Sequence, residues 1–343
     1  MEIALYDPTY GYYIAEHPIF GATGDYVTAP TLSPLFGACI ADFIAPQLQQ
    51  ITNPHIIELG AGNGALAVQI IQQLAHCEQQ VPYYILEISP TLRQKQQDYL
   101  AKHLSAEQYA RVQWLEAPPT EPWQGILLGN EVLDAFAVHS FEKKDDHSIL
   151  EGLVTIENQQ LQWYFDRPIT TTLTKAVQAL EKQLGVPFAP GYRSEICLNL
   201  QSWLPHYCTQ LTKGLILFID YGFNQATYYH PTRTQGTLMC HQGHRSHSDP
   251  LWQPGKQDIT AHVDFTAVAT HLASLGFEPC IFCPQAHFLL EMNILNKAQQ
   301  DLSPKAISAL QRLLQPHEMG ELFKVLALQK DISIPWSGRQ FPL

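Results

Sequence analysis

The stretch HIIELGAGNGAL, residues 55–66, decides the fold of this chain. Its apolar first half predicts a β-strand that ends at Glu58 and Leu59, and a glycine-rich turn follows. Apolar residues then recur at helical spacing from Leu66 to Leu74, so the turn leads into a helix. Glycine lets a backbone approach a ligand closely, and a helix N-terminus offers free N–H groups. The stretch therefore predicts a strand–turn–helix unit that holds a nucleotide-type ligand.

Outward from this stretch, predicted strands and helices alternate along the chain. Apolar patterns predict further strands at 83–88, 112–115, 125–129, 215–220, 277–282 and 323–328. Between and around them, helical spacing predicts helices at 35–48, 90–104, 263–275 and near 286–315. Such alternation is typical of a parallel sheet with helices on both faces. We therefore expect an α/β, Rossmann-like fold with a doubly wound, mostly parallel sheet.

Changes in composition divide the chain into a core with two additions. Residues 1–54 are expected to form an aromatic and helical N-terminal cap, and residues 55–136 and 212–330 the ligand-binding core. Residues 137–211 are expected to form an antiparallel β and helical insertion on the substrate side. Its predicted strands and helices lie at 138–142, 148–156, 161–165, 172–184 and 194–211. A histidine-, glycine- and proline-rich stretch at 222–258 is longer than an ordinary connection, which predicts a functional loop.

The composition limits the classes of partner. A net charge of −12 opposes nonspecific binding to nucleic acid or to an anionic membrane, and it suits a cationic protein surface. No apolar stretch approaches the roughly 20 residues that span a bilayer, so we expect no membrane insertion. Seven scattered cysteines, an odd number, favour free thiols and a cytoplasmic protein.

The glycine turn alone is compatible with two cofactors, and two nearby carboxylates favour one of them. The spacing of Gly60, Gly62 and Ala65 also satisfies the dinucleotide fingerprint, so an NAD-dependent oxidoreductase is the competing interpretation. Glu58, just before the turn, would repel a pyrophosphate but suits the cationic sulfonium of S-adenosylmethionine. Glu87, at the end of the next predicted strand, can accept hydrogen bonds from both ribose hydroxyls. We therefore favour S-adenosylmethionine.

Further polar residues follow the predicted strands 125–129 and 215–220. Asn130, Glu131 and Asp134 come after the first, and Asp220 ends the second. The carboxyl ends of parallel strands meet at one edge of a sheet, where open α/β folds bind ligands. Buried polar groups need partners, and a cofactor or a cationic substrate group would supply them.

Histidines at 241, 244 and 247, followed by Asp249, have spacing that suggests a metal site. We expect no metal there, and we assign His244 and Arg245 to the shape of the substrate groove.

An ordered set of motifs resembles the MidA family of methyltransferases across nearly the whole chain. The motifs are L-Y-x-P-x-Y-G-Y-Y at 5–13, G-D-Y-x-T-A-P at 24–30, E-L-G-x-G-x-G at 58–64, N-E-x-x-D-A at 130–135, D-Y-G at 220–222, G-T-L at 236–238 and P-G-x-x-D-I-T-A-H-V-D-F at 254–265. Mitochondrial members of that family assist respiratory complex I assembly as protein arginine methyltransferases. The resemblance implies a class I S-adenosylmethionine-dependent enzyme that acts on a protein side-chain nitrogen, with arginine favoured and a respiratory complex subunit suspected. The alternative that the protein is a cofactor-binding assembly chaperone with little turnover remains, and the protein could form a homodimer.

The motif residues and the matching family positions give the expected site. The expected cofactor-binding residues are Tyr26, Thr28, Glu58, Gly60, Ala61, Gly62, Gly64, Glu87, Ile88, Asn130 and Glu131. The expected catalytic residues are Glu131, Asp134, Asp220 and His262.

Overall fold

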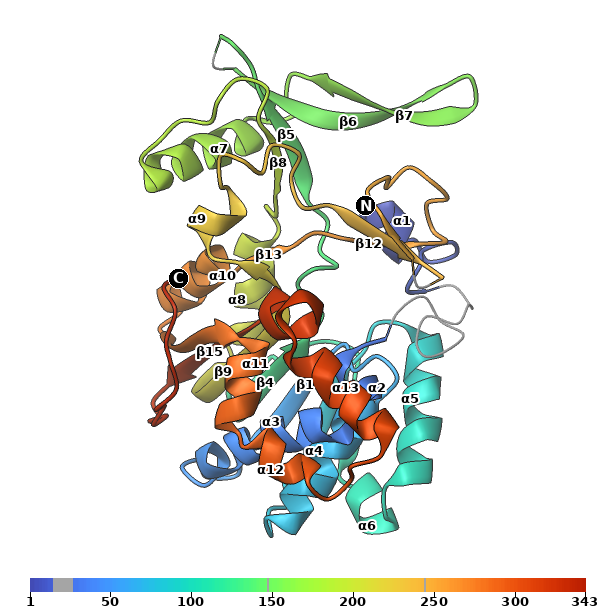
Figure 1. Ribbon diagram of the computed structural model, residues 1–343, viewed down its shortest axis with the longest axis vertical. Helices are drawn as coiled ribbons and strands as arrows, with labels where there is room; N and C mark the ends of the chain where they lie inside the picture. Colours follow the sequence, from blue (N-terminus) through green and yellow to red (C-terminus); the bar gives the residue numbers. More distant parts are fainter. Residues whose placement is uncertain (15–26, 147, 244) are drawn as a thin grey trace.

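A twisted central sheet organises the protein (Figure 1). The computed structural model describes residues 1–14, 27–146, 148–243 and 245–343. The strand order is β14-β15-β9-β4-β1-β2-β3, and a short β13 pairs with β9. These strands are β1 (His55–Leu59), β2 (Tyr83–Leu86), β3 (Val112–Leu115), β4 (Trp123–Asn130), β9 (Leu211–Phe223), β13 (Val263–Asp264), β14 (Glu278–Pro284) and β15 (Phe323–Lys330).

Strands β3, β2, β1, β4 and β9 run parallel, whereas β15 is antiparallel to both β9 and β14. The described sheet is thus mostly parallel, and the expected Rossmann-like α/β class is confirmed.

Helices cover both faces of the sheet because its central strands are apolar on both sides. In β9, Leu215 and Leu217 belong to one buried cluster, whereas Ile216 and Phe218 belong to the other. The first cluster is covered by α2 (Ala29–Leu32), α3 (Pro34–Leu48), α4 (Ala65–His76), α5 (Pro90–His103), α11 (Gln285–Glu291), α12 (Ile294–Ala298), α13 (Pro304–Leu314) and the π-turn η1 (Pro316–Gly320), with α6 (Ala106–Tyr109) beside α5. The second is covered by α8 (Leu200–Cys208) and α10 (Phe265–Ser274). The fold is therefore doubly wound.

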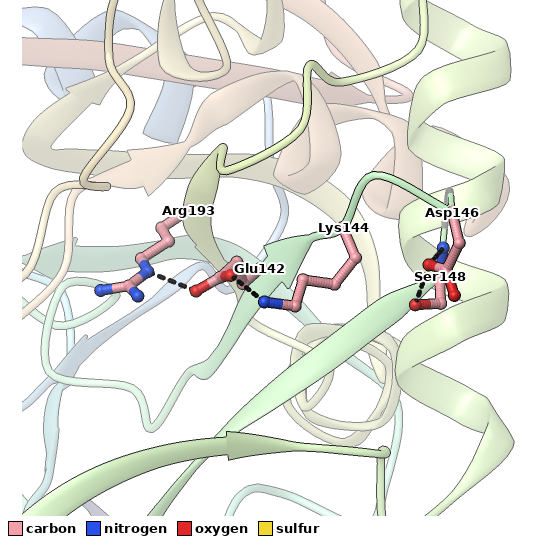
Figure 2. A network of polar contacts seen from close by, with 5 residues as sticks. All are labelled: Glu142, Lys144, Asp146, Ser148 and Arg193. Atoms are coloured by element: carbon pink, nitrogen blue, oxygen red, sulfur yellow. Dashed lines mark hydrogen bonds and ion pairs between the residues drawn. The ribbon is translucent and has the colours of Figure 1, made fainter.

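The insertion forms its own antiparallel sheet at the top of Figure 1, with α7 (Thr171–Leu184) packed against it. Its strand order is β7-β6-β5-β8, with β5 (His139–Lys143), β6 (Ile149–Glu157), β7 (Gln160–Asp166) and β8 (Arg193–Ile196). Figure 2 shows Glu142 on β5 between two cations. Its carboxylate accepts hydrogen bonds from Arg193 Nε at 2.6 Å and from Lys144 Nζ at 3.2 Å. The ion pairs join β8 and the β5–β6 turn to β5.

The helix predicted at 194–211 is wrong over its first residues, where the chain forms β8 instead. Glu195 on β8 is buried and accepts hydrogen bonds from Tyr228 and from the backbone of Thr237. These partners lie more than 30 residues away along the chain, so local helical spacing could not reveal them.

The expected long loop at 222–258 contains several short elements within a largely irregular stretch. It contains α9 (Gln225–Tyr228) and the strands β10 (Met239–Gln242) and β11 (Arg245–His247), and β12 (Asp258–Thr260) completes their sheet, ordered β11-β10-β12. This sheet lies beside α1 (Glu2–Tyr6), near the N-terminus in Figure 1. Cys240 of β10 and Ile259 of β12 form one buried cluster with Leu5 of α1. Strands from this region therefore anchor the start of the chain.

Among the helices that the structure describes, none has the length and apolar character needed to cross a bilayer.

Candidate active site

A cavity of about 340 Å³ opens at the carboxyl ends of β1, β2 and β4. Nine of the expected cofactor-binding residues line it together: Thr28, Glu58, Gly60, Ala61, Gly62, Glu87, Ile88, Asn130 and Glu131. Tyr26, also expected there, lies outside the described residues. The arrangement follows from topology, because parallel strands end at the same edge of the sheet.

The glycine turn between β1 and α4 uses a backbone that favours glycine. Gly60, Gly62 and Gly64 have φ values of +56°, +55° and +84°, all in the left-handed region. Gly60 and Gly62 line the cavity, but Gly64 is absent from its wall. A Cβ on Gly64 would lie 2.5 Å from Leu100 Cδ1 of α5. The contacts of Gly64 are thus those of helix packing, and its expected cofactor contact stays a prediction.

Glu58 is almost fully buried at the end of β1. Its Oε2 accepts a hydrogen bond from the Tyr83 hydroxyl at 2.7 Å. Burial, together with repulsion from Glu87, raises the pKa of Glu58 to about 7 although the Tyr83 hydrogen bond opposes that rise. Such a carboxylate gains most from a cationic ligand, since a cation favours the ionised form.

Glu87 follows β2 and is held on two sides by the protein. Its Oε1 accepts from the backbone N–H of Ser89 at 2.9 Å, and its Oε2 accepts from Gln96 Nε2 at 2.9 Å. Burial raises the pKa of Glu87, and these hydrogen bonds oppose the rise. Sequence reasoning missed Gln96 because nothing but its buried position on α5 distinguishes it from the other glutamines there.

Asn130, the last residue of β4, and Glu131, which follows it, line the cavity at the end of this strand. Asn130 Nδ2 donates to Glu131 Oε1 at 3.1 Å, while Asn130 Oδ1 is buried and has no hydrogen-bond partner among the described residues. Glu131 has a φ of +53°, an uncommon conformation for a side-chain-bearing residue. Burial and repulsion from Asp134 raise the pKa of Glu131 to about 8.

S-adenosylmethionine fits the groups that this cavity presents. The unpartnered Asn130 Oδ1 and the carboxylates of Glu58 and Glu87 are hydrogen-bond acceptors. An ammonium group and two ribose hydroxyls are the donors that such a set requires. The turn at Gly60 and Gly62 brings backbone to the cavity wall without side chains.

Three expected catalytic residues lie behind the cavity wall rather than on it. Asp220 is buried at the end of β9, and its Oδ2 accepts from the backbone N–H groups of Val132, Leu133 and Asp134 at 3.2, 2.9 and 3.2 Å. Burial raises the pKa of Asp220, with repulsion from Asp134 and Glu131 adding to the rise. Its described contacts position the loop after β4, and its catalytic role stays a prediction.

Asp134 and His262 both contact Tyr221, Asp134 through a hydrogen bond and His262 through its ring. Burial raises the pKa of Asp134 to about 6, although a hydrogen bond from the Tyr221 hydroxyl opposes that rise. The His262 ring stacks on Phe223 at 5.2 Å, and burial followed by repulsion from Arg233 lowers its pKa to about 4. His262 is therefore neutral near pH 7. It lines a separate cavity between α7, α8 and α10, and the catalytic roles of both residues stay predictions.

Aromatic residues that sequence reasoning did not assign to the site form much of the remaining wall. They are Tyr6, Tyr13, Phe136, Trp203 and Tyr207. The Tyr6 hydroxyl donates to the Ala135 carbonyl at 3.0 Å, and the Tyr13 hydroxyl donates to Asp258 Oδ1 at 2.8 Å. Tyr6 and Tyr13 belong to the motif at residues 5–13, which could have pointed to them. Trp203 and Tyr207 lie on α8, which only the tertiary fold brings to the cavity.

The histidine-rich stretch carries no cluster of three or more metal-ligand side chains in the described ranges. His244 lies outside them. His247 and His241 fall on paired strands β11 and β10, and His247 Nδ1 accepts from the backbone N–H of Asp249 at 3.2 Å. The expectation of no metal stays an expectation.

Curated relatives match almost the full chain. A Drosophila melanogaster protein named as a mitochondrial homologue of protein arginine methyltransferase NDUFAF7 is 26% identical over 96% of this chain and 80% of its own length. The Bos taurus protein arginine methyltransferase NDUFAF7, also named mitochondrial, is 27% identical over 96% and 78%. These names contradict the expectation of a cytoplasmic protein, which is therefore wrong. Free cysteines and an acidic charge suit either compartment, so composition could not decide it.

Solved structures agree with the fold and with the cofactor. A Burkholderia thailandensis protein bound to S-adenosyl-homocysteine is 35% identical, covers 97% of this chain and 87% of its own, and has a TM-score of 0.89. A second structure from the same organism is 36% identical, with coverages of 97% and 86% and a TM-score of 0.86.

The family described as "Putative S-adenosyl-L-methionine-dependent methyltransferase" matches residues 39–283. The matched range includes the glycine turn, Glu87 and the Asn130–Glu131 pair, and residues of all three line the cavity. The chain belongs to this family and is a methyltransferase whose cofactor is S-adenosyl-L-methionine.

Proposed function

We propose that this protein transfers a methyl group from S-adenosylmethionine to an arginine side chain of a protein. One observation carries the proposal: Glu131 presents a carboxylate to the cofactor cavity from a left-handed backbone, with its pKa raised to about 8. A cationic guanidinium is the partner that would favour the ionised form of this carboxylate. The names of the curated relatives and the net charge of −12 support the same substrate class.

Positioning supplies most of the catalysis in this proposal. The cofactor supplies a methyl group on a cationic sulfonium. Glu58 and Asn130 hold its amino-acid end, Glu87 holds the ribose, and Glu131 orients the acceptor nitrogen. An aligned nitrogen needs no strong base before the methyl group has moved, so orientation dominates the rate. In this assignment, residues 1–54 cap the cavity, 55–136 and 212–330 form the core, and 137–211 lie on the substrate side.

The proposed acceptor protein is a subunit of respiratory complex I, a choice that the MidA resemblance supports. The test is mass spectrometry of the complex from cells with and without this protein. We expect one arginine methyl mark that disappears without the protein and returns with the wild type, but not with Glu131→Gln. A full set of arginine marks in cells that lack the protein would reject this acceptor.

Turnover is tested separately with purified protein, labelled S-adenosylmethionine and complex I from the deficient cells. Label on arginine supports the proposal. Cofactor binding without transfer of label to protein would instead indicate an assembly factor with little turnover.

A further inference from the structure

We infer that Gln96 is a positioning residue that sets the geometry of the ribose site by holding the Glu87 carboxylate and the glycine turn together. Gln96 lies on α5 and is fully buried. Its Nε2 donates to Glu87 Oε2 at 2.9 Å and to the Gly62 carbonyl at 3.0 Å. Both partners line the cofactor cavity, whereas Gln96 does not. One amide group therefore ties two walls of the cavity to each other.

The orientation of this amide is fixed by Trp114 on β3. Trp114 Nε1 donates to Gln96 Oε1 at 3.0 Å. Because an indole N–H can only donate, it requires the amide oxygen on its side and leaves the two amide hydrogens for Glu87 and Gly62. Every polar atom of the Gln96 side chain is thus used. In the flipped amide, the NH₂ group would face the Trp114 N–H, donor against donor, and the Glu87 carboxylate and the Gly62 carbonyl would lose their donor.

Gln96 also determines what Glu87 can offer to a ligand. An ionised carboxylate has about four acceptor positions. Gln96 and the Ser89 backbone use one position on each oxygen, so both oxygens keep capacity for the two ribose hydroxyls. The same two hydrogen bonds oppose the pKa rise that burial causes, so they favour the ionised acceptor. The inference rests on the assignment of Glu87 to the ribose, which belongs to the proposed site.

The test substitutes Gln96→Glu, which keeps the shape and the acceptor for Trp114 but removes the donors. Affinities for S-adenosylhomocysteine and its 2′-deoxy form are measured by calorimetry at pH 8 and pH 6. We expect Gln96→Glu to lose about tenfold or more in affinity for the ribose form at pH 8. At pH 6 the loss shrinks, because the two neighbouring carboxyl groups can share a proton and Glu87 regains a donor. Discrimination against the 2′-deoxy form should also shrink.

The ratio of the two affinities separates positioning from general damage. A merely structural defect would weaken both ligands equally, so an unchanged ratio in Gln96→Glu would overturn the inference. Gln94→Glu is the matched control, because Gln94 is exposed on the same helix and receives the same charge change. It should match the wild type for both ligands.

A second variant covers the case in which Gln96→Glu does not fold. Trp114→Phe keeps an aromatic ring at this position but removes the N–H that orients the amide. It should reduce discrimination between the two ligands in the same direction, and wild-type discrimination in Trp114→Phe would count against the inference.

Two further results separate this inference from the assignments beneath it. Wild-type protein that binds neither ligand would overturn the cofactor site itself. Wild-type protein that binds both equally would remove Glu87 from the ribose and the inference with it. Discrimination that depends on Glu87 but survives Gln96→Glu would overturn the inference alone.

Discussion

Glu131 carries two unfavourable features at once: its backbone is left-handed, and desolvation of its half-buried side chain raises the pKa of the carboxyl group. Each costs about 1–3 kcal/mol in an ordinary protein, so the surrounding structure must hold the residue in place. The backbone N–H of Glu131 donates to the Ile219 carbonyl at 2.9 Å, and Asn130 contacts its side chain. Strain at a ligand cavity is what a residue that orients a substrate would show.

We predict that Glu131→Gln lowers kcat/KM for methyl transfer by about 100-fold, since a neutral amide cannot hold a guanidinium as an ion pair. Wild-type kcat/KM should rise with pH and level off above about 8, because the carboxylate form is the active one and the pKa of Glu131 is about 8. The measurement is a pH–rate profile. Glu107→Gln on α6 is the exposed control, and a rising limb that persists near pH 8 in Glu131→Gln would exclude Glu131 as its source.

The glycines of the turn should separate by function. We predict that Gly62→Val removes measurable binding of S-adenosylmethionine, because a side chain at φ +55° would be strained and would occupy the cavity wall. Gly64→Ala should instead lower the free energy of unfolding by about 1–3 kcal/mol, because its Cβ would meet Leu100. Calorimetry and urea unfolding measure the two effects, and wild-type affinity in Gly62→Val would contradict the assigned site.

At the scale of elements, β9 and the loop after β4 are joined through a single side chain. Asp220 Oδ2 accepts from three backbone N–H groups of that loop, and Oδ1 accepts from the backbone N–H of Tyr221 at 2.9 Å. The loop begins beside Glu131. The geometry of the cavity wall near Glu131 thus depends on a contact between the ends of the neighbouring strands β9 and β4.

We predict that Asp220→Asn lowers the free energy of unfolding by about 1–3 kcal/mol. Both carboxylate oxygens face N–H donors, so either orientation of an amide sets its NH₂ group against at least one of them. Urea unfolding measures the loss, and Asp98→Asn on exposed α5 surface is the control. Unchanged stability together with lost turnover would instead favour a direct catalytic role for Asp220.

At the scale of the whole molecule, the proposed cofactor site concentrates acids whose pKa values are raised by desolvation. The pKa of Glu58 is about 7 and that of Glu131 about 8, so the folded protein holds more protons than the unfolded chain near neutral pH. Protonation of these two carboxyl groups favours the folded state. This contribution to the free energy of unfolding is fully present at low pH and is lost as the pH rises through the folded-state pKa values. Ligand-free protein therefore loses stability in the range where the site becomes competent to bind a cation.

We predict that the free energy of unfolding of ligand-free protein falls by at least about 2 kcal/mol from pH 6.5 to pH 8.5. S-adenosylmethionine should raise Tm more at pH 8.5 than at pH 6.5, because ionised carboxylates bind its cationic groups better. Urea unfolding and thermal scans measure both effects. The double variant Glu58→Gln, Glu131→Gln should flatten the pH dependence, and a slope that it leaves intact would assign the effect to other groups.

Local patterns carried the prediction of the sheet and of the cofactor cavity. Strand β1, the glycine turn and α4 follow one another without a break, so periodicity and turn chemistry describe them completely. Glu87 comes directly after β2 and Asn130 is the last residue of β4, and the shared edge of a parallel sheet brings them to one place. The helix predicted at 194–211 failed at β8, where pairing with β5 overrides local spacing.

The sequence by itself determined the fold class, the cofactor and the end of the sheet where most of the expected cofactor-binding residues meet, because each depends on residues that are adjacent in the chain or on strand ends that topology must align. Only the tertiary structure decided what Gln96 and Asp220 contact. Gln96 meets Gly62 and Trp114 across 34 and 18 residues, and Asp220 meets Leu133 across 87. A hydrogen bond of that span leaves no periodic trace in a sequence, since it depends on where two separately formed elements come to lie.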